Sequence, residues 1–194
     1  MPARVCLIQG HPEAEGHLCH ALADAYARGA EAAGATVDRV SVAEIAPAPL
    51  ASAAEFDTEP GGAMTVARES VRAATHLVIV FPLWLGTQPA LLKAFFEQMA
   101  RAGFALSAAE SETAWPKQNL RGRSAHVIVT MGMPAIAYRV WFLNSGVAVL
   151  KRMVLGMAGV SPVRQTTIGG VGALSESAAR RWLERIEAAG RALR

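Results

Sequence analysis

The sequence HLVIVF at residues 76–81 decides the fold. Its nearly continuous hydrophobicity is typical of a central parallel strand that is covered on both faces. Further strand patterns stand at residues 4–8 (RVCLI), 36–40 (TVDRV), 124–130 (SAHVIVT) and 162–168 (PVRQTTI). The sequence therefore predicts five strands, with residues 76–81 in the middle of the sheet.

Helical patterns separate these strands. Helices are expected at residues 16–33, 63–74, 89–101, 138–157 and 175–193, the fourth interrupted near 144–146, whereas residues 43–62 look irregular. Five alternations of strand and helix favour parallel βαβ units with right-handed crossovers. We therefore predict one domain over residues 1–194, of the α/β class. Its sheet is doubly wound, parallel and five-stranded, in the order 2-1-3-4-5, with helices on both faces.

Composition and charge exclude several classes of protein. The chain has 194 residues, of which 52% are hydrophobic and 18% charged, with a formal net charge of +3. Its basic residues are scattered rather than gathered in a stripe, which argues against nucleic acid as a partner. No uninterrupted apolar stretch is long enough for a membrane span, and the amino terminus lacks the apolar stretch of a signal peptide. We expect a cytoplasmic protein.

Three loops are the candidate functional segments. In open parallel sheets, ligands bind beyond the carboxyl ends of the strands, near the point where the winding direction switches. In this chain that rule selects the loops after Gln9, Phe81 and Thr130.

The first loop, residues 10–20, joins a strand to a helix, where unpaired backbone N–H groups attract phosphate. His11 and His17 can add hydrogen bonds or positive charge. Neither GxGxxG nor GxxxxGK[ST] is present, which disfavours a direct dinucleotide fold and a P-loop. An ordinary connecting loop is the alternative. A metal site made of His11, His17, Cys19 and His20 is disfavoured by their irregular spacing, and no metal is expected.

The second loop, residues 81–89, reads FPLWLGTQP. Its prolines stiffen the backbone. Exposure of Trp84 and Leu85 to water at the end of a strand is unfavourable, and a flat aromatic cofactor packed on them would shield them. The alternative is that Trp84 packs against its own fold or against a second subunit.

The third loop follows Thr130 and contains Gly132, which allows close approach of a ligand to the backbone. Tyr138 lies on the next helix and is expected to point its hydroxyl back at the same site. Met131 and Met133 are equally well explained as core residues.

Taken together, these segments resemble the flavodoxin-like NAD(P)H:quinone oxidoreductase family. The resemblance covers nearly the whole chain, and its most specific part is the second segment. The matching segments are residues 10–19, FPLWLGTQPALLKAFFEQM (81–99), Gly103-Phe104-Ala105, TMGMPAIAYR (130–139) and LKRMVLGMAGVSPVRQTTIG (150–169).

The resemblance implies tightly bound FMN or FAD and a ping-pong transfer of hydride from NAD(P)H to a quinone-like acceptor. It also implies a homodimer with its active sites at the interface. The implied cofactor-binding residues are His11, His17, Leu18, Cys19, Pro82, Leu83, Trp84, Leu85, Gly86, Thr130, Met131, Gly132, Met133 and Tyr138. The Gly132 N–H and the Tyr138 hydroxyl would be the catalytic donors, and Phe104 would face the acceptor, either in its own site or in the partner's.

Large apolar side chains at residues 141–143 and at Phe95-Phe96 independently favour a dimer. The sequence departs from the family pattern at Leu85-Gly86, at residues 131–133 and at residues 144–146, where no histidine is available for a tyrosine–histidine charge relay. A one-electron carrier and a non-catalytic regulatory module remain as alternatives. FMN or FAD, NADH or NADPH, and the acceptor all stay open.

Overall fold

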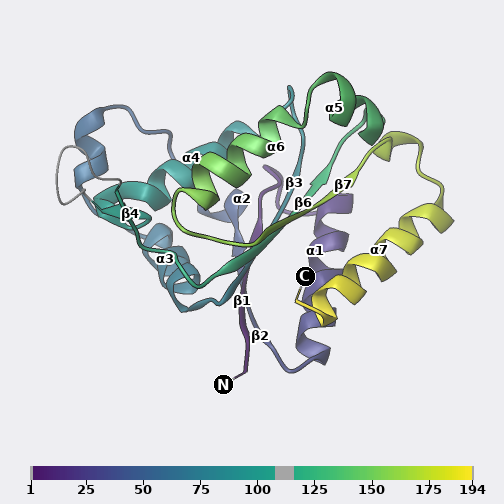
Figure 1. Cartoon of the computed structure of the whole chain (residues 1–194), viewed down its shortest axis with the longest axis horizontal. Coiled ribbons are helices and arrows are strands. Elements are labelled where there is room, and N and C mark those ends of the chain that lie inside the picture. The colour runs from purple at the N-terminus through teal and green to yellow at the C-terminus, as the bar shows by residue number, and fades with distance from the viewer. Residues whose placement is uncertain (1, 108–115, 194) are drawn as a thin grey trace.

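The fold is described by a computed structural model covering residues 2–107 and 116–193. Five parallel strands form the main sheet in the order β2-β1-β3-β6-β7 (Figure 1), which confirms the predicted order. The strands are β1 (Arg4–Gln9), β2 (Thr36–Ser41), β3 (His76–Pro82), β6 (Ser124–Thr130) and β7 (Val163–Ile168).

Helices cover both faces of this sheet, as predicted (Figure 1). One face is covered by α1 (Leu18–Ala32) and α7 (Glu176–Arg191). The other is covered by α3 (Ala63–Ala73), α4 (Ala90–Ala100), α6 (Ser145–Val149) and the π-helical η3 (Leu150–Gly156).

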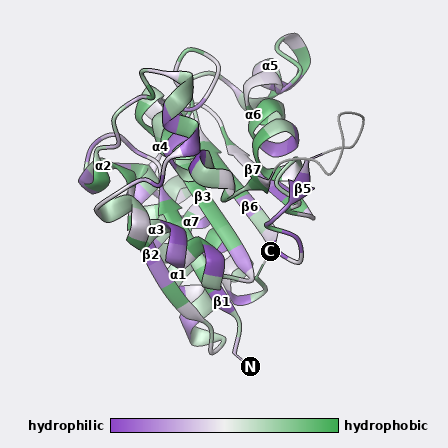
Figure 2. Ribbon diagram, turned by 90° about the vertical axis from the view of Figure 1, so that its left-hand side faces the viewer, coloured by the Kyte–Doolittle hydropathy of each residue, from purple (hydrophilic) through white to green (hydrophobic). Residues whose placement is uncertain are grey.

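The central strand β3 explains why two layers of helices are needed. Its side chains alternate, so that Leu77, Ile79 and Phe81 enter one apolar core and Val78 and Val80 enter the other. All five of these residues are buried. Figure 2 shows β3 as a largely hydrophobic strand running through the middle of the molecule. A strand buried on both faces is what the continuous HLVIVF pattern predicts.

Close packing of α1 on α7 depends on two small residues. A Cβ atom on Gly29 would lie 2.0 Å from the carbonyl oxygen of Glu187, and one on Gly190 would lie 2.2 Å from that of Tyr26. The two helix backbones approach so closely that only glycine fits at either position.

The remaining elements are short. The segment predicted as irregular contains α2 (Val42–Ile45) and η1 (Ala53–Asp57), and the predicted interruption of the fourth helix separates α5 (Ala135–Trp141) from α6 at Asn144, whose φ is +56°. Sequence patterns did not predict η2 (Arg101–Gly103), the antiparallel pair β4 (Leu106–Ser107) and β5 (Lys117–Gln118), or η4 (Val171–Ala173). Among the described residues, no helix is long and apolar enough to cross a membrane.

Candidate functional site

The three predicted loops meet at the carboxyl edge of the sheet. Leu83 donates its N–H to the carbonyl of Thr130 at 2.7 Å, which joins the second loop to the third. Cys19 Sγ lies 3.2 Å from Thr130 Oγ1, which joins the start of α1 to the same point. The rings of His11 and Trp84 stand edge to face with centroids 6.1 Å apart, which joins the first loop to the second.

His11 presents a hydrogen-bond donor at this edge. Its side chain is buried, and its Nδ1 accepts the N–H of Glu13 at 3.0 Å. Because Nδ1 uses its lone pair in that bond, the neutral ring carries its proton on Nε2. Burial, followed by the charges of His17 and His20, lowers the pKa of His11, which favours the neutral ring. Within residues 2–107 and 116–193, Nε2 of His11 has no hydrogen-bond partner.

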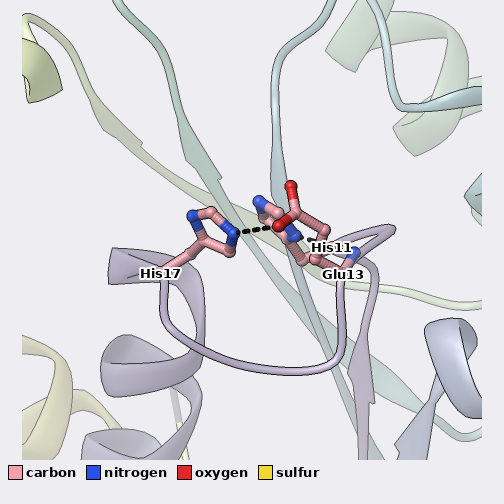
Figure 3. A group of neighbouring side chains, drawn as sticks. All are labelled: His11, Glu13 and His17. Atoms are coloured by element: carbon pink, nitrogen blue, oxygen red, sulfur yellow. Dashed lines mark hydrogen bonds and ion pairs between the residues drawn. The ribbon is translucent and has the colours of Figure 1, made fainter.

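Two further histidines gather around His11. The His17 ring stacks on it with centroids 3.9 Å apart, and His17 Nε2 lies 3.0 Å from a carboxylate oxygen of Glu13 (Figure 3). His20 accepts the N–H of His17 at its Nδ1, and its Nε2 lies 3.1 Å from the carbonyl of Glu13. The three rings therefore hold the first loop in place.

His11, Glu13 and His17 bring possible metal-ligand atoms within 4.8 Å of one another. The hydrogen bonds of His11 argue against a metal, because Nδ1 is occupied and Nε2 carries a proton instead of a lone pair. Ring N–H donors are suited to an anion. Glu13 supplies such an anion within the chain, since the hydrogen bond and charge of His17 lower the pKa of its carboxyl.

The second loop turns sharply at its tip. Trp84 and Thr87 exchange backbone hydrogen bonds of 2.9 and 3.1 Å around Leu85 and Gly86, whose φ angles are +48° and +85°. Positive φ at both central residues is typical of a type I′ turn. Leu85 is fully exposed and Trp84 is half exposed, so this turn presents two large apolar side chains to solvent. Pro82 and Leu83, nearer the sheet, are half-buried.

The third loop offers open space at Gly132. This residue is exposed, and a Cβ atom added to it would meet nothing within 4 Å. Met131 is buried in the core and Met133 packs partly against it, as the packing explanation for these methionines requires.

The Tyr138 hydroxyl has two hydrogen-bond partners within the chain. Its buried hydroxyl donates to the carbonyl of Gly86 at 3.0 Å and accepts the N–H of Val147 at 3.2 Å. The hydroxyl therefore ties the second loop to α6 instead of pointing freely over the third loop. Gly146 makes the same junction possible, because a Cβ atom there would lie 2.0 Å from the Gly86 oxygen. Sequence reasoning did not single out Gly146, although a glycine beside a helix break was a signal for it.

Phe104 is not brought to the three loops within this chain. It lies four residues beyond the end of α4, which begins directly after the second loop. The Phe104 ring is buried beneath the guanidinium groups of Arg68 and Arg72, which lie 4.5 and 5.0 Å from its centroid. The Phe95–Phe96 pair is also buried, and it adds nothing to the exposed apolar surface.

At the start of α1, Leu18 is half-buried and Cys19 is buried, as is Thr130 at the end of β6. Burial raises the pKa of Cys19 to about 11, so its thiol is protonated and unreactive at neutral pH. These three residues are placed to shape the site by packing.

A parallel sheet in this order, with three loops gathered at its carboxyl edge, defines an α/β protein of the flavodoxin class. More particularly, residues 3–190 match the family model Flavodoxin_2, described as a flavodoxin-like fold, and the chain belongs to this family. The family membership expected from the sequence is therefore confirmed.

Solved structures with the same fold span nearly the whole chain. Smu.1420 from Streptococcus mutans has a TM-score of 0.83 at 23% identity, covering 97% of this chain and 99% of its own. An NAD(P)H:quinone oxidoreductase from Methanothermobacter marburgensis has a TM-score of 0.81 at 20% identity, with both chains fully covered. An FMN-dependent NADH-azoreductase from Bacillus anthracis, solved with FMN, has a TM-score of 0.76 at 16% identity, covering 98% and 99%. None of the curated proteins compared with the chain matches it.

Proposed function

We propose that this protein binds a flavin, FMN or FAD, at the three-loop site and transfers hydride from NAD(P)H to a quinone-like acceptor by a ping-pong reaction. The observation that carries the proposal is the convergence of a buried histidine donor, an exposed tryptophan and an open glycine at one edge of the sheet. The similarity to a quinone oxidoreductase and to an FMN-dependent azoreductase supports it.

The residues present suit the parts of a flavin. His11 and His17 offer ring N–H donors for a phosphate beside the first backbone N–H groups of α1. Trp84 offers apolar surface to a planar ring, and the more exposed Leu85 offers apolar surface to an acceptor that stacks on that ring. Gly132 lets its own N–H approach a ring heteroatom, because no side chain stands in the way.

The bound flavin would supply the hydride chemistry, and the protein would position and tune it. With a flavin bound, the Gly132 N–H would be a hydrogen-bond donor for its ring, because nothing stands within 4 Å of where a Gly132 side chain would be. Tyr138 acts in this proposal through the second loop, because its hydroxyl fixes the Gly86 carbonyl.

A homodimer forms part of the proposal. Helix α5 and the turn after it expose large apolar side chains that a second copy would cover; they are Ile136, Val140, Trp141, Phe142 and Leu143. A symmetric dimer is the usual closed assembly for such a surface. In such a dimer, the Phe104 that contacts an acceptor at one three-loop site would belong to the other chain.

Spectroscopy and turnover test the proposal together. Purified protein should be yellow, should bleach when NADH or NADPH is added without oxygen, and should regain its colour with menadione. Mass analysis of the released flavin separates FMN from FAD. Failure to take up either flavin would contradict the proposal, whereas flavin that NAD(P)H does not reduce would favour a one-electron carrier or a regulatory module.

A further inference from the structure

Glu13 is held by all three histidines of the first loop. Its N–H bonds to Nδ1 of His11 at 3.0 Å, and its carbonyl lies 3.1 Å from Nε2 of His20. Its carboxylate lies 3.0 Å from Nε2 of His17 (Figure 3). Each polar group of Glu13 thus contacts a different ring. Its negatively charged carboxylate contacts His17 Nε2, the donor that a phosphate would use.

The contact between Glu13 and His17 can open without disturbing the fold. The Glu13 side chain is 66% exposed and belongs to a loop, so its carboxylate can swing into water while the backbone bonds to His11 and His20 remain. An exposed pair of this kind is weak. A phosphate dianion competes for the same ring N–H and is repelled by the carboxylate as long as the two are adjacent.

We propose that Glu13 is a displaceable internal anion that occupies His17 until the phosphate of the flavin replaces it. This inference rests on the proposed flavin site and adds a residue that sets its affinity. The carboxylate reduces the affinity for a flavin phosphate and has no effect on a flavin that lacks one. The site would therefore hold its phosphorylated cofactor less tightly than its donors allow.

Glu13→Gln tests the inference, because the amide keeps the size of the side chain and removes its charge. Glu15→Gln is the matched control: Glu15 is exposed in the same loop and has no hydrogen bond or ion pair among the described residues. Dissociation constants for FMN and for riboflavin are measured with apoprotein by fluorescence titration. We expect Glu13→Gln to bind FMN about three- to tenfold more tightly, from relief of one exposed charge contact. Its riboflavin affinity should be unchanged, and Glu15→Gln should shift FMN binding less than twofold.

The outcomes separate this inference from the proposed function. Equal FMN affinity in wild type and Glu13→Gln, or an equal gain for riboflavin, overturns the role of Glu13 while leaving the flavin site intact. Absence of binding of either flavin to any variant overturns the proposed function and this inference with it. In a His17→Leu background, which has no donor at this position, the effect of Glu13→Gln should vanish, and its persistence there would show that the carboxylate does not act through His17.

Discussion

His76 and His11 are both buried, but the hydrogen-bond partners of their ring nitrogens differ. At the start of β3, His76 has partners on both ring nitrogens: the Tyr26 hydroxyl at 2.9 Å and the Ser124 hydroxyl at 2.7 Å. At the carboxyl edge, His11 has a partner on Nδ1, and none on Nε2 among the residues that the structure describes. Burial lowers the pKa of both. A histidine bonded on both sides serves the fold, whereas one with an unpaired donor is available to a ligand.

This comparison predicts that changes at His76 affect stability and changes at His11 affect binding.

The largest expected effect is acid destabilisation through His76. Burial, with smaller contributions from the charges of His126 and Arg164, lowers the pKa of His76 from 6.5 to about 4. The unfolded chain takes up this proton between pH 6.5 and 4 while the folded chain does not. The stability is therefore fully present above pH 6.5 and lost as the pH falls towards 4, by about 3 kcal/mol. Urea unfolding between pH 8 and 4 measures it.

His76→Gln is the control for the acid experiment. This variant should be less stable at pH 8 and should lose less stability than wild type as the pH falls, because the buried ring that resists protonation is gone. If both proteins lose the same free energy of unfolding, the acid sensitivity arises elsewhere. Flavin affinity at pH 8 should be the same in both.

Replacement of His11 should have the opposite signature. His11→Leu removes the ring donor and supplies no other, so FMN should bind about tenfold to a hundredfold more weakly, the range for a hydrogen bond to a charged group. His20→Leu is the matched control, because both ring nitrogens of His20 already contact backbone groups within the loop. FMN titration of the two variants decides the point, and equal weakening would show that loop order matters more than the His11 donor.

Tyr138 tests whether a buried hydroxyl with partners within the chain, like the ring of His76, serves the fold and not a ligand. Tyr138→Phe leaves the Gly86 carbonyl and the Val147 N–H without this partner, which should lower the free energy of unfolding by about 1–2 kcal/mol. Stopped-flow reduction of the flavin by NADPH should slow less than about threefold, since the hydroxyl is already committed within the chain. Slowing of tenfold or more would restore Tyr138 as a catalytic donor.

The sequence predicted what depends on local pattern. The run HLVIVF placed β3 in the centre of the sheet, and the topology rule placed the loops after Gln9, Phe81 and Thr130 at one edge. Partners distant in sequence were not predictable. The Tyr138 hydroxyl bonds to a carbonyl 52 residues away, and nothing in the pattern around Tyr138 specifies it.

Phe104 and Glu13 illustrate the same limit. The resemblance placed Phe104 near the acceptor of its own site or of the partner's, but within one chain the ring packs beneath Arg68 and not among the three loops. Glu13 was not singled out from the sequence, because its three histidine contacts exist only after the loop has folded. Sequence patterns thus predict the strands and the loops at the site, but not which side chains contact one another.

Leu85 extends the comparison from hydrogen bonds to apolar contacts. Its side chain is fully exposed, and its φ of +48° is a conformation that costs a residue with a Cβ about 1–2 kcal/mol. Within the described part of the chain, a side chain so exposed gains little that offsets this cost. Like the Nε2 of His11, it is presented outwards, and we expect it to contact the acceptor.

The smallest expected effect on stability is therefore a gain on removing Leu85. Leu85→Gly relieves the cost of positive φ but adds freedom to the unfolded chain, so unfolding should become about 0.5 kcal/mol more difficult. The KM for menadione should rise severalfold while FMN affinity stays the same, because the lost contact is with the acceptor. Trp84 stays in place in this variant, so the flavin spectrum serves as the control. A more stable protein with an unchanged KM would show that Leu85 contacts no acceptor, and would leave the exposed turn without a role in the reaction.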